Sequence, residues 1–104
     1  MEQELQDNQL KIELTDEVAD GIYSNLAILS HSHSEFVIDF VRVTPGMPKA
    51  KVKSRIIVTP QHAKRLLMAL KDNISKYEST YGLIKETEPL NGMPLNFGGP
   101  TAQA

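Results

Sequence analysis

Four segments in the first half of the chain have apolar side chains at every second position, which is the pattern of a β-strand: 10–14, 22–30, 35–44 and 50–58. Segments 22–30 and 35–44 are apolar on both faces, as in strands that are covered on both sides. The sequence Pro-Gly-Met-Pro at 45–48 interrupts the pattern, because proline cannot donate to a sheet ladder. We therefore predict four consecutive strands.

The period changes from two to 3.6 at Thr59-Pro60. Thr59 suits a helix N-cap and Pro60 suits the first helical position. An apolar stripe follows at helical spacing and stops before Gly82, a natural C-terminal residue: Ala63, Leu66, Leu67, Leu70, Ile74, Tyr77 and Tyr81. The predicted fold is α+β, a four-stranded antiparallel β-meander followed by one long C-terminal helix packed on one sheet face.

Residues 9–84 hold these patterns and are predicted to form a single domain. Residues 1–8 are polar and acidic, and we expect a disordered arm there. Residues 85–104 are rich in proline and glycine and have no period, so we expect a disordered tail.

One helix covers only one face of a sheet, so large apolar side chains would be left bare on the other face: Tyr23, Leu29, Val37, Val41 and Val43. Soluble monomers rarely expose a patch of that kind. We expect a second copy to cover it, which makes the protein a homodimer or a higher oligomer. The alternative is that the C-terminal tail covers the same face.

Charge is sorted along the chain, although the net charge is only −2. Residues 1–40 contain nine acidic side chains and one basic one, and residues 41–76 contain nine basic side chains and one acidic one. The basic residues near the fourth predicted strand could form a strip that binds phosphates: Arg42, Lys49, Lys51, Lys53 and Arg55. The six aromatic residues are mostly committed to the predicted core and helix stripe, which leaves few stacking platforms for nucleic acid.

Catalytic signals are weak. The chain has no cysteine, no glycine-rich phosphate loop and no nucleophile elbow, so we predict neither an enzyme nor a cofactor. Asp39 is the one carboxylate expected on a largely apolar strand face. A structural ion pair with Arg42 or with a lysine of segment 50–58 is the favoured interpretation, and a catalytic acid is the alternative.

The histidines give an equally weak metal signal. His31 and His33 are spaced as two metal ligands on one strand face, but no cluster completes a set, so we expect turn residues and no metal site. His62 lies in the first turn of the predicted helix and suits a capping or surface role.

Several segments together resemble an uncharacterised bacterial family, the domain of unknown function 3467: residues 34–40, 50–55, 59–64 and Tyr77-Glu78 before Gly82. The resemblance runs from Asp20 to Ile84 and leaves out the acidic arm and the tail. The family has no assigned activity, so the resemblance implies no catalytic residues. Sheet-then-helix units of this kind also resemble the export chaperone SecB and dimeric coactivators that bind single-stranded DNA, and a likeness of fold does not transfer function.

We therefore expect a small non-enzymatic, oligomeric binding module for a protein or polypeptide partner, SecB-like in the chaperone interpretation. The alternative is a nucleic-acid-binding protein that uses the basic strand face. No apolar run is long enough to cross a membrane and the first residues are acidic, so we expect a cytoplasmic protein without a membrane partner.

Overall fold

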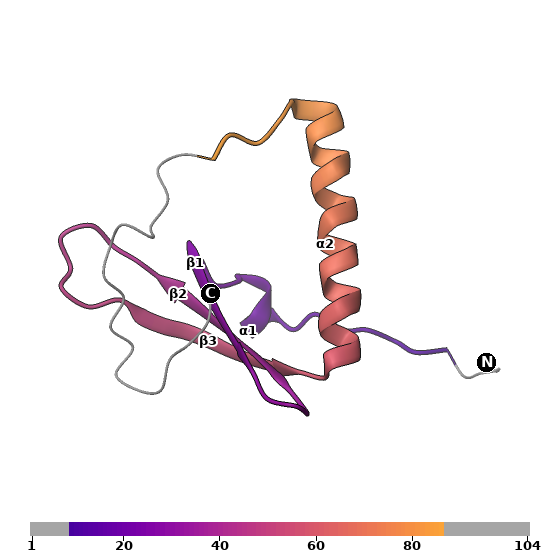
Figure 1. Ribbon diagram of the computed structural model, residues 1–104, viewed down its shortest axis with the longest axis horizontal. Coiled ribbons are helices and arrows are strands. Elements are labelled where there is room, and N and C mark those ends of the chain that lie inside the picture. The colour runs from indigo at the N-terminus through magenta and orange to yellow at the C-terminus, as the bar shows by residue number, and fades with distance from the viewer. Residues whose placement is uncertain (1–8, 87–104) are drawn as a thin grey trace.

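The computed structural model describes residues 9–86. In this range the element order is α1 (Asp16–Ala19), β1 (Leu26–His31), β2 (Phe36–Arg42), β3 (Lys51–Val58) and α2 (Pro60–Tyr81) (Figure 1). The strands form one antiparallel sheet in the order β1-β2-β3, so the predicted α+β arrangement with a C-terminal helix is confirmed. The arm predicted at 1–8 and the tail from 87 to 104 lie outside the described residues.

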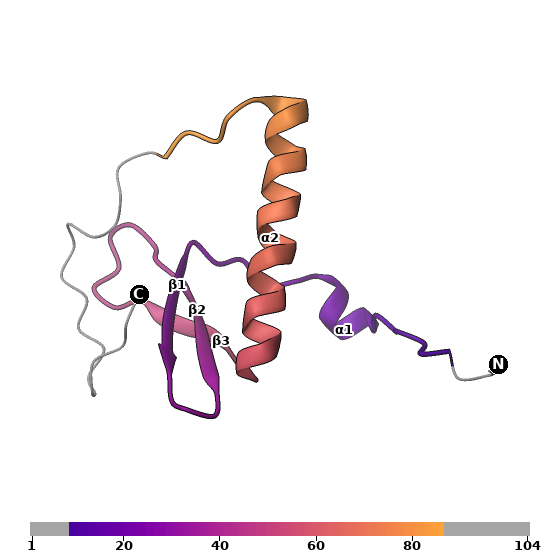
Figure 2. The same cartoon turned by 45° about the vertical axis from the view of Figure 1, so that its right-hand side comes forward.

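A fourth strand is not seen among the described residues. Residues 9–14 are extended but pair with no strand there, and Leu10, Ile12 and Leu14 are 86%, 90% and 70% exposed. The single turn of α1 and the positive φ of 75° at Gly21 direct this segment away from the sheet (Figure 2). Alternation shows that one face of a segment is apolar, but it does not show where a pairing strand lies, and the prediction was wrong for that reason.

The first hairpin forms where it was predicted, but β1 runs over Leu26–His31 and residues 22–25 of the predicted strand lie outside it. The loop between β1 and β2 is closed by the Ser32 N–H, which donates to the Glu35 carbonyl at 2.9 Å. The Ser32 hydroxyl oxygen accepts from the N–H groups of Ser34 at 3.2 Å and Glu35 at 3.3 Å. Small polar residues thus form this turn because their side chains replace missing backbone partners.

The pairing of β2 with β3 contains a β-bulge. Phe40 pairs with Ser54 and Val41 pairs with Val52, so Lys53 is an extra residue on β3. Since a bulge shifts the alternation of side chains, Val52 lies on the opposite face from Ser54. The strict alternation predicted through 50–58 is therefore wrong at Lys53.

The two faces of the sheet can be named from β2. The Ile38 face carries Phe36, Ile38 and Phe40 with their cross-strand partners, and the Val41 face carries Val37, Asp39 and Val41 with theirs. Among the described residues, only four hydrophobic side chains are buried: Ile28, Ile38, Val41 and Val58. This is a small core for a chain of 104 residues with 40% hydrophobic composition.

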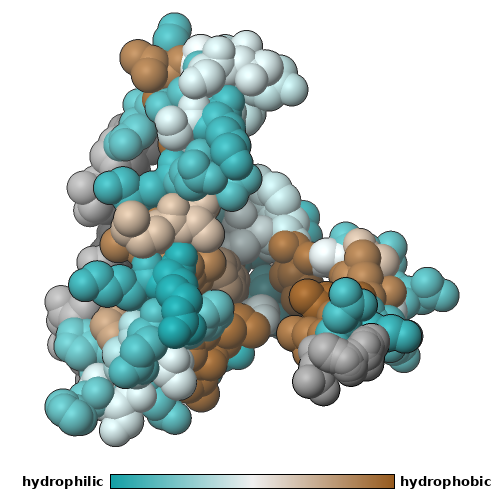
Figure 3. Space-filling view, turned by 90° about the vertical axis from the view of Figure 1, so that its right-hand side faces the viewer, coloured by the Kyte–Doolittle hydropathy of each residue, from teal (hydrophilic) through white to brown (hydrophobic). Residues whose placement is uncertain are grey.

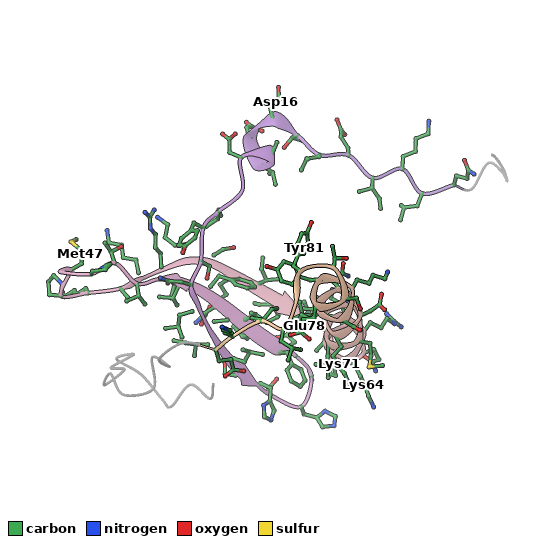
Figure 4. All side chains as sticks on the ribbon, turned by 90° about the horizontal axis from the view of Figure 1, so that it is seen from above. Asp16, Met47, Lys64, Lys71, Glu78 and Tyr81 are labelled. Carbon is green, nitrogen blue, oxygen red and sulfur yellow. The ribbon has the colours of Figure 1, made fainter. Side chains whose placement is uncertain are left out.

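Helix α2 begins and ends as predicted. The Thr59 side chain accepts from the His62 N–H at 3.1 Å, Pro60 occupies the first turn, and Gly82 ends the helix with a φ of 95°. The helix rises beside the sheet, and none of its residues is buried (Figures 1 and 4). Thr59 is the only residue between β3 and α2, so the direction of the helix is set at the end of the strand. The close packing of the helix on one sheet face that the sequence predicted is not found.

Candidate functional site

The residues predicted to form the assembly surface do not share one face of the sheet. Val37 and Val41 lie on the Val41 face, and Val41 is buried at 3% exposure. Leu29 pairs with Ile38 and so lies on the Ile38 face. Tyr23 precedes β1 and is 66% exposed, and Val43 follows β2. The register that separates them depends on the turn between β1 and β2, which the residue pattern alone did not fix.

The predicted basic strip is also divided. The Arg42 guanidinium lies over the Tyr23 ring, 5.7 Å from its centroid, which is a cation–π geometry. Lys51 pairs across the sheet with Arg42, and Lys49 precedes β3. Arg55 lies on the Val41 face, where it pairs with Asp39.

Asp39 and Arg55 form a bidentate ion pair across β2 and β3. Arg55 Nε donates to Asp39 Oδ1 at 2.6 Å, and Arg55 Nη2 donates to Asp39 Oδ2 at 2.8 Å. Asp39 is 2% exposed, whereas the Arg55 side chain is 56% exposed. The hydrogen bonds from Arg55 lower the pKa of Asp39 below its ordinary value of 3.8, against the opposing effect of burial. The same bonds raise the pKa of Arg55.

This geometry fits a structural role. A carboxylate that is ionised at neutral pH and has both oxygens bound is a poor proton donor, and the pair ties β2 to β3 beside the bulge. The expectation that Asp39 is paired is confirmed, but its partner is Arg55 and not Arg42 or a lysine. The pairing of positions 39 and 55 depends on the register of β2 against β3, which the residue pattern does not give.

The histidines do not gather. The His31 ring stacks on Phe36 with centroids 5.3 Å apart, at the closing pair of the first hairpin. Within residues 9–86, no group of three histidine, aspartate or glutamate side chains could hold a metal ion.

Helix α2 carries a row of exposed apolar side chains. The stripe that the sequence assigned to the core is open: Leu67 55%, Leu70 55%, Ile74 38%, Tyr77 50% and Tyr81 74% exposed. Figure 3 shows hydrophobic surface, in brown, on the arm that carries residues 9–14 and again on the body of the molecule facing it. The sequence pattern identified the stripe of α2 but predicted that the sheet of the same chain would cover it.

A cavity of about 380 Å³ adds to this open surface. It lies between the α1 region and the Ile38 face, and it is lined mainly by apolar atoms of Glu17, Val18, Gly21, Ile22, Ser24, Phe40, Ser54 and Ile56. Among the described residues, the α1 region therefore does not fully cover the part of the Ile38 face that lines this cavity.

Comparison with known proteins gives a family. Residues 1–86 match the model of DUF3467, described as a protein of unknown function. The chain belongs to this family. The DUF3467 match includes residues 1–19, which the resemblance seen in the sequence had left outside. No curated protein and no solved structure matches the chain. No helix in the described part of this DUF3467 protein is long and apolar enough to cross a membrane.

Proposed function

We propose that this DUF3467 protein is a small non-enzymatic binding module that works as a homo-oligomer and takes a protein or polypeptide partner. The observation that carries the proposal is the exposed apolar stripe of α2, together with the exposed apolar residues of segment 9–14. We expect the module in the cytoplasm, as the sequence suggested, and we expect neither a cofactor nor a membrane partner.

The proposal follows from the balance of buried and exposed apolar surface. Fully burying a large aliphatic side chain stabilises a fold by about 1.5–3 kcal/mol. Among the described residues, only four hydrophobic side chains are buried and contribute in this way. The stripe on α2 and the apolar residues of segment 9–14 remain largely in water. An exposed apolar patch of this kind is typical of a protein interface.

The extended segment supports a polypeptide partner in particular. Its backbone has no partner among the described residues, and β1 and β3 each have one unpaired edge there. Unpaired strand backbone can pair with an extended chain, and alternate apolar side chains then supply the contacts. The open cavity on the Ile38 face is lined by residues of the α1 region and by Ser54 and Ile56 of the edge strand β3.

Nucleic-acid binding is the weaker candidate. Arg55 is engaged by Asp39, Arg42 lies over Tyr23, and the bulge at Lys53 breaks the even spacing of the strip. A continuous row of free cations would track phosphates better than this divided set.

The test is a binding titration with the purified protein at two salt concentrations. We expect it to bind a labelled, chemically unfolded polypeptide with little dependence on salt, and not the folded form of the same polypeptide. Failure to bind the unfolded polypeptide, together with a salt-sensitive shift of labelled single-stranded DNA, would overturn the proposal in favour of the nucleic-acid alternative. Lys51→Glu with Lys53→Glu is the matched variant, because it reverses two strip charges and leaves the Asp39–Arg55 pair intact.

A further inference from the structure

The apolar stripe of α2 has a heptad spacing. Six of its seven members follow one another at intervals of four, three, four, three and four residues, and the seventh, Leu66, flanks this row: Ala63, Leu67, Leu70, Ile74, Tyr77 and Tyr81. This is the a and d pattern with which one helix packs against another, and it continues along almost the whole of α2. The i, i+4 ion pair of Asp72 with Lys76, at 3.0 Å, lies on the opposite, outer face.

We propose that α2 pairs in an antiparallel arrangement with α2 of a second copy. This inference rests on the homo-oligomer of the proposed function and names the surface that forms it. This row is available in each copy, since no residue of α2 is buried and five of the six residues at heptad spacing are exposed.

Side-chain size favours the antiparallel direction. In an antiparallel pair centred near position 72, Ala63 meets Tyr81 and Leu67 meets Tyr77 of the second copy, so a smaller residue faces a larger one, and Leu70 meets Ile74, which is of equal size. A parallel pair would place Ala63 against Ala63 at one end and Tyr81 against Tyr81 at the other. Complementary sizes fill the space between two helices evenly, and matched extremes leave gaps or clashes.

Charge favours the same direction. The residues that flank the stripe on one side are Lys64, Lys71 and Glu78, and Figure 4 shows them following one side of α2. In an antiparallel pair these positions face each other, so Lys64 of each copy meets Glu78 of the other and two ion pairs form. The two Lys71 side chains also meet at the centre, and this one like-charge contact offsets part of the gain. In a parallel pair Lys71 would face Leu66 and Glu78 would face Asn73, which gives no ion pair.

The absence of cysteine makes a clean cross-linking test. Lys71→Cys and Lys64→Cys are matched single variants, with the same residue type on the same side of α2, one heptad apart. The antiparallel pair brings the two copies of position 71 together and separates the two copies of position 64 by about 21 Å along the helix. We expect a short bis-maleimide linker to join Lys71→Cys into a covalent dimer and to leave Lys64→Cys monomeric on a denaturing gel.

A double variant, Lys64→Cys with Glu78→Cys, keeps the test independent of the central position. We expect it to cross-link because the cysteine at position 64 of each copy meets the cysteine at position 78 of the other copy. Equal cross-linking of Lys64→Cys and Lys71→Cys would indicate a parallel pair and overturn the proposal. An oligomer in which neither Lys71→Cys nor the double variant cross-links would overturn this inference alone, whereas a monomeric parent chain would also overturn the oligomer of the proposed function.

Discussion

Replacing Leu70 by alanine isolates the contribution of the α2 stripe to assembly. Leu70 is 55% exposed and lies at the centre of the stripe. Fully burying a leucine contributes about 1.5–3 kcal/mol, so burying the exposed half contributes about 1 kcal/mol in each copy and about 2 kcal/mol in a symmetric pair. Since about 1.4 kcal/mol corresponds to a factor of ten, we expect the dimer Kd to rise about 30-fold.

Met68→Ala is the matched control for Leu70→Ala. Met68 lies on the same helix and is 58% exposed, but it is outside the heptad stripe. Both substitutions remove a half-exposed side chain of similar size and both keep a good helix former. Sedimentation equilibrium of the two variants should show weakened association for Leu70→Ala only. Equal Kd values for both variants would refute the assignment of the stripe to an interface.

Three further predictions test the site and the fold. Because the pKa of Asp39 is lowered below 3.8, the ion pair with Arg55 stabilises the fold above that pH and the stabilisation is lost as pH falls through the folded-state pKa. Asp39→Asn should therefore lower the Tm at pH 7, and the difference from the parent chain should shrink in melts below pH 3.8; a difference independent of pH would contradict the pairing. Thr59→Ala should destabilise the fold by about 1 kcal/mol in urea unfolding, because the His62 N–H loses its cap, whereas Thr59→Ser should be nearly neutral. The parent chain and the Lys51→Glu, Lys53→Glu variant should both fail to shift labelled single-stranded DNA at low salt, and a shift by the parent chain alone would support the phosphate strip.

Local signals in the sequence predicted local structure well. The Thr59 cap and the Gly82 stop each depend on residues within a few positions, and both are found. Segment 10–14 was predicted as a strand from alternation alone, but strand pairing is a non-local property that alternation cannot locate.

The surfaces were harder to predict than the elements. Leu29 and Val41 were assigned to one face, and the hairpin register puts them on opposite faces. The bulge at Lys53 similarly puts Val52 and Ser54 on opposite faces, against the alternation predicted through 50–58. The stripe of α2 was recognised, but the periodicity of a helix shows which side is apolar and not which surface covers it.

The most direct test of the proposed assembly is the mass of the full chain in solution over a wide range of concentration. Sedimentation equilibrium from about 1 μM to 1 mM spans the Kd range of weak and moderate dimers, about −8 to −4 kcal/mol of association. We expect the mass to rise to at least twice the 11.6 kDa of one chain within this range. A mass of one chain at the highest concentration would contradict the proposed assembly, since the exposed stripe of α2 would then be tolerated in a monomer.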